Sequence, residues 1–142
     1  MSESIAAASL REVLEALSAR DLDRVSAVVD ENFEFVDVGG GETMHNREEW
    51  RAFCDVFVTA FPDLTQDVRL LVDAGEYAFA EVVARGTHTG PLATPDGDIA
   101  PTGRTIEIPF CVVMHARDGL LVDGREYYDA GTLLGQLGLT AA

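Results

Sequence analysis

The first third of the chain has the hydrophobic spacing of helices that bury one face. A first helix is predicted by apolar residues at positions i, i+3, i+4 and i+7, namely Leu10, Val13, Leu14 and Leu17. A second helical pattern opens at Asp21, because an aspartate there caps the first turn and favours the positive end of the helix dipole. A third begins at Asn46, with Glu49 in capping position, and ends before Pro62.

Most of the remaining chain has the composition of long β-strands. Segments rich in β-branched and aromatic residues cover 68–72, 77–88, 105–115 and 120–128, with turn residues at 73–75 and 118–119. A brief strand with Phe33, Phe35 and Asp37 on one side precedes the glycines at 39–41, and a short helix is expected at 130–138. Helices followed by strands predict an α+β domain, with helices on one face of an antiparallel sheet.

The connection at 86–103 is long and rich in glycine and proline. Such a composition is typical of an extended hairpin connection that folds over one end of a sheet. It can act as a lid over a pocket, or it can be a solvated link with no further role. The sequence leaves both interpretations open.

Composition limits the class of partner. The chain has 142 residues and no linker, so a single domain, 1–142, is expected. With 25 acidic and 10 basic residues, the formal charge of −15 repels nucleic acid and anionic membranes. No apolar run approaches the roughly 20 residues of a membrane span, and the start lacks a secretory pattern. Cys54 and Cys111 are expected to be free thiols, and a cytoplasmic location is expected.

Five short motifs give the chain a family resemblance. They are Ala60-Phe61-Pro62-Asp63-Leu64, Gly86-Thr87-His88-Thr89-Gly90-Pro91, Pro101-Thr102-Gly103-Arg104, Asp118-Gly119 and Tyr127-Tyr128-Asp129. Their order and spacing resemble those of the SnoaL-like polyketide cyclases of the nuclear transport factor 2-like superfamily. The resemblance implies a curved antiparallel sheet that forms a cone-shaped barrel around a pocket. It also implies an aldol ring closure without metal or organic cofactor, begun by a carboxylate that removes a proton beside a carbonyl.

Asp129 matches that carboxylate by motif position. A carboxylate in an apolar pocket has a raised pKa, which suits a general base. The alternative is that Asp129 caps the helix expected at 130–138. Residues 125, 127 and 129 share one face of the last strand, with Glu126 and Tyr128 opposite. An ion pair between Arg125 and Asp129 would lower the carboxylate pKa and argue against a base.

His88 and Asp37 are the other catalytic candidates. His88 shares a strand face with small alanines and can polarise a carbonyl, or it can hydrogen-bond across its hairpin. Asp37 resembles the proton-shuttling aspartate of ketosteroid isomerase, at the end of the first strand. The oxyanion donors of that enzyme correspond to positions near Val13 and Phe110, where neither donor is present. Steroid isomerisation is therefore disfavoured, and a solvated strand-end aspartate is the alternative.

Aromatic residues are the candidates for substrate binding. They are Trp50, Phe53, Phe57, Tyr127 and Phe110, although an aromatic stripe at helical spacing is also typical of plain core. The three histidines are dispersed, so no metal site is predicted.

The leading functional hypothesis is a cofactor-free acid–base enzyme acting on a small apolar carbonyl compound, by ring closure or isomerisation. A non-catalytic module that binds a small ligand is the alternative, and an epoxide hydrolase-like enzyme is a third. The family resemblance also implies a homodimer formed through the convex face of the sheet.

Overall fold

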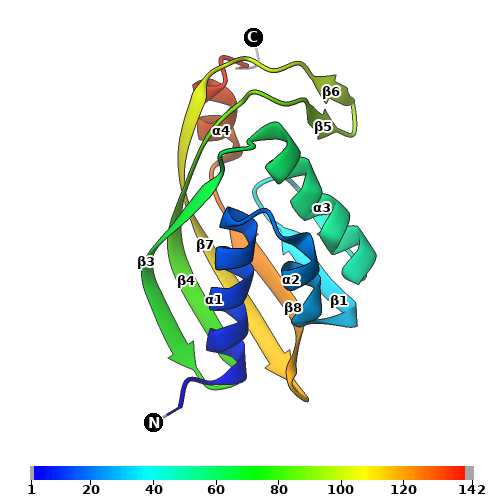
Figure 1. The fold of residues 1–142 in the computed structure, drawn as a ribbon, viewed down its shortest axis with the longest axis vertical. Helices are drawn as coiled ribbons and strands as arrows, with labels where there is room; N and C mark the ends of the chain where they lie inside the picture. Colours follow the sequence, from blue (N-terminus) through cyan, green and yellow to red (C-terminus); the bar gives the residue numbers. More distant parts are fainter. Residues whose placement is uncertain (1, 140–142) are drawn as a thin grey trace.

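The computed structural model describes residues 2–139 and confirms the α+β fold (Figure 1). Residues 1 and 140–142 of the expected domain lie outside the described part. The helices are α1 (Ile5–Ser18), α2 (Leu22–Ala27), α3 (Arg47–Ala60) and α4 (Ala130–Gln136). The strands are β1 (Val29–Asp37), β2 (Glu42–Met44), β3 (Thr65–Ala74), β4 (Tyr77–Thr87), β5 (Leu92–Thr94), β6 (Gly97–Ile99), β7 (Thr105–Arg117) and β8 (Leu120–Tyr127).

Six strands form one curved sheet in the order β2-β1-β8-β7-β4-β3, and α1, α2 and α3 lie on its concave side (Figure 1). Two details differ from the sequence prediction. The sheet does not close into a barrel, because β2 and β3 end it at opposite edges. It is also not wholly antiparallel, since β1 pairs with β8 in parallel, with Asp37 in register with Glu126. The helices therefore close the open side of the half-barrel.

The predicted helix starts at Asp21 and Asn46 are confirmed. The Asp21 carboxylate accepts a hydrogen bond from the Arg24 backbone N–H, and the Asn46 side chain accepts one from the Glu49 N–H at 2.8 Å. Glu49 reaches back to the N–H of His45, one residue earlier than a capping box requires. These bonds satisfy backbone donors that have no partner within the helix.

The core lies between the helices and the concave face of the sheet. All four apolar positions predicted for the first helix, 10, 13, 14 and 17, are buried. An aromatic cluster joins β1 to α3, where the rings of Phe35 and Trp50 have centroids 4.4 Å apart. This cluster fixes the distance between α3 and the sheet, and so sets the width of the space beneath α3.

Two of the shared motifs hold the C-terminal end of α3 against the end of β4. The Asp63 carboxylate accepts hydrogen bonds from the Thr87 backbone N–H at 2.7 Å and from the Thr87 hydroxyl at 2.8 Å. Gly90 approaches the backbone so closely that a side chain there would collide with the Thr59 carbonyl oxygen. These motif residues act structurally, because they place the connection at 86–103 beside α3, where β5 contacts it.

Candidate functional site

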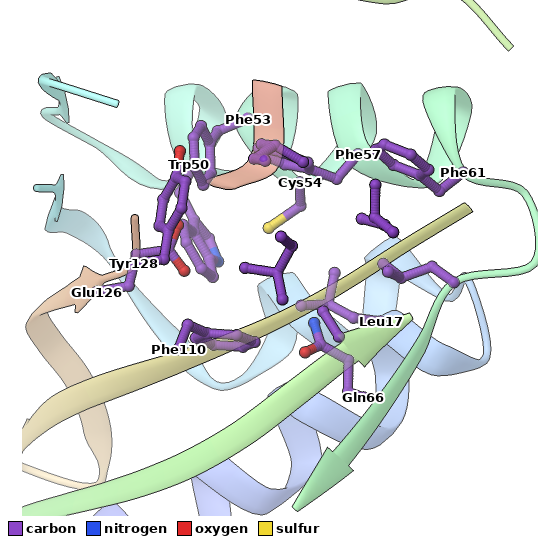
Figure 2. Close-up of a pocket in the computed structure, with 15 residues that line it drawn as sticks. Leu17, Trp50, Phe53, Cys54, Phe57, Phe61, Gln66, Phe110, Glu126 and Tyr128 are labelled. Carbon is purple, nitrogen blue, oxygen red and sulfur yellow. The ribbon is translucent and has the colours of Figure 1, made fainter. Parts of the chain in front are cut away.

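An inner cavity of ≈ 100 Å³ lies between α3 and the concave face of the sheet (Figure 2). Its wall is mostly apolar and comes from α1, α3, the strands β3, β4, β7 and β8, and α4. The lining residues are Leu17, Trp50, Phe53, Cys54, Phe57, Phe61, Leu64, Gln66, Ala84, Ile106, Ile108, Phe110, Glu126, Tyr128 and Leu133. Such a space suits a small apolar group that a few polar side chains orient.

A wider outer cleft of ≈ 800 Å³ lies next to the cavity. The β5–β6 hairpin, α3, α4 and the Asp37–Gly40 turn line it. Phe53, Phe57, Tyr128 and Leu133 line both spaces and therefore form the wall between them. The connection at 86–103 is thus the outer wall of this cleft rather than a detached solvated link.

Glu126 carries the one carboxyl group among the described residues that line the inner cavity. Its strand neighbour in register is Asp37, so the two carboxyl groups project from the same face of the sheet. Burial, followed by the negative charge of Asp37, raises the Glu126 pKa from 4.5 to about 8. Glu126 is therefore mostly protonated at neutral pH and can donate a proton or a hydrogen bond.

Asp37 lies at the end of β1, with only 2% of its surface exposed. Its carboxylate accepts hydrogen bonds from the Tyr128 hydroxyl and the Gly40 N–H, both at 3.2 Å. Burial raises the Asp37 pKa, and these two bonds oppose the rise. Two close carboxyl groups resist double ionisation, so Asp37 holds the charge while Glu126 keeps the proton.

The turn Gly39-Gly40-Gly41 needs glycines because its backbone packs closely against Asp37 and Tyr128. A side chain at Gly40 would collide with the Asp37 carboxylate, and one at Gly39 would lie 2.7 Å from the Tyr128 carbonyl oxygen. Gly41 has a φ of +73°, a conformation that favours glycine. The turn can therefore wrap closely around Asp37 and place the Gly40 N–H against its carboxylate.

Two further polar atoms of the cavity wall lack partners. Among the described residues, neither the indole Nε1 of Trp50 nor the amide Oε1 of Gln66 has a hydrogen-bond partner, although both atoms are buried. Figure 2 shows Trp50, Tyr128 and Glu126 together at one end of the cavity, whereas Gln66 lies apart from them, beside Leu17. Buried polar groups are usually satisfied, so these two mark positions where a ligand can bond.

The expectation that Asp129 lies in an apolar pocket is wrong. Its side chain is exposed and caps α4, accepting hydrogen bonds from the backbone N–H groups of Gly131 and Thr132 and from the Thr132 hydroxyl. These bonds lower the Asp129 pKa, which is the reverse of the expected shift. Arg125, which was considered as an ion-pair partner of Asp129, donates instead to the Tyr127 hydroxyl at 3.0 Å.

His88 is fully buried but lies on the wall of neither space. Its Nδ1 accepts a hydrogen bond from the Thr102 N–H at 3.2 Å, and its ring lies 5.5 Å from that of Phe61. Burial lowers the His88 pKa, so the ring is neutral at neutral pH. The structure therefore confirms the alternative for His88, which is a hydrogen bond across the connection.

Four of the five aromatic candidates, Trp50, Phe53, Phe57 and Phe110, lie on the cavity wall, where their contact with substrate stays a prediction. Tyr127 does not, because it points to the convex side of the sheet and is 44% exposed.

The sequence reasoning missed Glu126 and Tyr128. The alternation of side chains along β8 separated its two faces correctly, but the face that carries Tyr127 was wrongly taken as the inward one. Among the described residues, no group of three or more metal-ligating side chains comes together.

Comparison with known proteins decides the family. The model of the SnoaL-like polyketide cyclases matches residues 7–137. The chain belongs to this family. Among curated proteins, none matches it.

Within the described residues, no helix is long and apolar enough to span a membrane.

Solved structures share the fold. IdmH from Streptomyces antibioticus, to which polyketide cyclase activity is ascribed, is 27% identical, with a TM-score of 0.74 over 92% of this chain and 96% of its own. A protein from Jannaschia sp. CCS1, assigned to the SnoaL-like cyclases, is 15% identical, with a TM-score of 0.84 over 98% and 95%. An M. tuberculosis LEH-like epoxide hydrolase is 16% identical, with a TM-score of 0.72 over 95% and 90%.

Proposed function

We propose that this SnoaL-like protein is a cofactor-independent acid–base enzyme that acts on a small, mostly apolar carbonyl compound by ring closure or isomerisation. The observation that carries the proposal is the in-register pair of carboxyl groups, Asp37 and Glu126, beside an apolar cavity. Their environments separate the two pKa values, which assigns a base and an acid. The base role thus moves from Asp129 to Asp37.

Asp37 alone balances the proton of the proposed reaction, because it first removes the proton and then returns it. The Asp37 carboxylate takes a proton from the carbon beside the carbonyl, the electron pair of the broken C–H bond forms the C=C bond of an enolate, and the C=O π pair moves onto the oxygen. In a ring closure, the resulting enolate carbon forms a bond with a second carbonyl carbon of the same molecule. The alkoxide formed there takes back the proton that Asp37 removed. In an isomerisation, the substrate is a β,γ-unsaturated ketone, and the proton returns instead to the γ carbon of the dienolate.

Tyr128 supports the base in this scheme. Its hydroxyl donates to Asp37, and the surrounding burial and negative charges raise the Tyr128 pKa, so it stays protonated. It thereby holds one carboxylate oxygen in place, and Gly40 holds the other. Tyr128 also belongs to the wall between the two spaces, so substrate entering from the outer cleft passes the base.

The test is hydrogen–deuterium exchange at the carbon beside the carbonyl of acetophenone, 2-tetralone and cyclopentanone in D₂O, followed by proton NMR. Wild-type protein should accelerate exchange of at least one ketone, and Asp37→Asn should reduce that acceleration about 10²- to 10⁴-fold. Glu34→Gln is the matched control, because Glu34 is an exposed carboxylate on the opposite face of β1. Absence of acceleration by wild type, or equal rates in Asp37→Asn, would contradict the proposal.

A non-catalytic ligand-binding role is the second candidate. The observation that favours it is the small size and apolar wall of the inner cavity. Binding of these ketones without accelerated exchange would support it. Epoxide hydrolysis has less support, because no arginine lies among the described residues that line either space, whereas that chemistry was expected to need one between two aspartates.

A homodimer formed through the convex face of the sheet is also proposed. That face exposes large apolar side chains, including Leu70, Tyr77, Phe79 and Tyr127. Exposed apolar surface of this kind is typical of association sites. Light scattering should give twice the 15.3 kDa chain mass, and Phe79→Glu should return it to one chain. A wild-type mass of one chain would exclude the dimer.

A cytoplasmic location remains part of the proposal. It is supported by Cys54 and Cys111, which are both free thiols, as is usual in a reducing compartment. Fractionation of the source cells tests it, and recovery outside the cytoplasm would contradict it.

A further inference from the structure

Trp50 presents an unusual hydrogen-bond donor to the inner cavity. It is the single tryptophan of the chain, and only 3% of its surface is exposed. Its Nε1–H is buried and has no acceptor among residues 2–139, although Trp50 lines the cavity. An indole nitrogen can only donate, and a buried indole usually finds an acceptor. The position therefore indicates a ligand atom that accepts a hydrogen bond.

Trp50 lies near Glu126 because of the strand register. Its ring packs on Phe35, which is in register with Gly124 on β8. Two residues further along the same strand faces come Asp37 and Glu126. Figure 2 shows the indole and the Glu126 carboxyl group at the same end of the cavity. Among the described residues, no protein group hydrogen-bonds to the Glu126 carboxyl group, so its O–H is also available to a ligand.

We propose that the Trp50 Nε1–H and the protonated carboxyl group of Glu126 donate to the same ligand oxygen, which is a carbonyl oxygen that becomes an enolate oxygen. A carbonyl oxygen has two lone pairs and can accept both bonds. This inference rests on the proposed function, since it orients the substrate with its carbonyl between these donors and its acidic C–H toward Asp37. The pair supplies the oxyanion stabilisation that is missing at Val13 and Phe110, the positions where ketosteroid isomerase resemblance would place it.

The inference also defines a substrate class. The carbonyl group must lie at the Glu126 end of an aromatic-walled cavity of ≈ 100 Å³, so the group next to it is small, flat and apolar. Larger parts of the molecule extend past Phe53 and Tyr128 into the outer cleft. Aryl ketones and cyclic ketones with an adjacent C–H satisfy both conditions.

The test compares acetophenone with α-methylstyrene, which has the same shape but a CH₂ group in place of the oxygen. With ¹⁵N-labelled protein, the single indole N–H signal should move downfield with acetophenone and not with α-methylstyrene. Wild type should bind acetophenone more tightly than α-methylstyrene. In Trp50→Phe, which keeps a ring but loses the donor, this preference should fall about two- to tenfold.

Further variants separate the two donors and control for folding. Glu126→Leu should reduce the preference for acetophenone, whereas Glu126→Gln, whose amide still donates, should retain most of it. Glu34→Gln on the opposite sheet face should leave it unchanged. An indole signal that acetophenone does not move, an equal preference in wild type and Trp50→Phe, or no binding of either probe would overturn the inference.

The outcome is distinguishable from that of the proposed function. If acetophenone moves the indole signal but its exchange is not accelerated, the donor pair stands and the proposed reaction fails. If exchange is accelerated but Trp50→Phe changes neither the rate nor the binding preference, the reaction stands and the donor pair fails.

Discussion

Replacing Glu126 with glutamine tests whether its carboxyl group is buried and neutral. Glutamine keeps the shape of the protonated acid and cannot ionise. In the wild-type chain, the Glu126 pKa is about 8 when folded, against an ordinary value of 4.5, which applies to the unfolded chain. The folded state therefore binds more protons than the unfolded state between these two pKa values. Stability must fall as the pH rises through this window.

The magnitude follows from the separation of the two pKa values. The difference, 8 − 4.5 = 3.5, at about 1.36 kcal/mol for each tenfold change in proton affinity, gives about 5 kcal/mol as the upper limit of the loss. Because Glu126 is only partly buried, we expect about 2 to 5 kcal/mol. Asp37, whose pKa is also raised, adds a loss of the same sign at lower pH in wild type and variant alike.

The assay is urea unfolding of wild type and Glu126→Gln at intervals from pH 5 to 9.5. The free energy of unfolding of wild type should fall, relative to that of Glu126→Gln, across this range and level off above about pH 8.5. Glu34→Gln should follow wild type, since its carboxylate is exposed. Parallel curves for wild type and Glu126→Gln would refute a raised Glu126 pKa, and with it the acid assigned to the site.

Three other substitutions test the surroundings of the site. Gly40→Ala should destabilise the fold by about 1 to 3 kcal/mol and slow ketone exchange, because the new methyl group displaces the Asp37 carboxylate; unchanged stability and rate would contradict the close approach. Asp129→Ala should cost about 0.5 to 2 kcal/mol through loss of the α4 cap while leaving ketone exchange unchanged, and a lost exchange rate would return Asp129 to the site. Asp63→Ala should lower the free energy of unfolding by about 1 to 3 kcal/mol, since it removes both bonds to Thr87, and equal urea midpoints would contradict this structural role.

Local patterns predicted most of the fold because each element is encoded by nearby residues. The inward face of α1 follows from helical spacing alone, and the start of α3 follows from the cap at Asn46. The parallel pairing of β1 with β8 could not be predicted in this way. It joins Asp37 to Glu126, which lie far apart in the sequence, and no local pattern carries that register.

Only part of the site could be predicted, because local patterns do not show which strand face lies inside. Alternation along the last strand separates Tyr127 from Glu126 and Tyr128, but it does not say which face is concave. The motif position of Asp129 drew attention to a helix cap, whereas the buried carboxyl group lies three residues earlier, at Glu126. Asp37 was found because its position resembles that of the strand-end aspartate of ketosteroid isomerase, and the structure buries it on the same side of β1 as Phe33 and Phe35.

The central claim is that, at neutral pH, Asp37 carries the negative charge and Glu126 carries the proton. Carbon-13 NMR titration of their carboxyl carbons measures this directly. Comparison with Asp37→Asn and Glu126→Gln assigns the two signals. The account predicts that Glu126 titrates near pH 8, that Asp37 titrates well below it, and that Asp37→Asn lowers the Glu126 pKa. A Glu126 carboxyl group that titrates near its usual value of 4.5, unaffected by Asp37→Asn, would contradict the account.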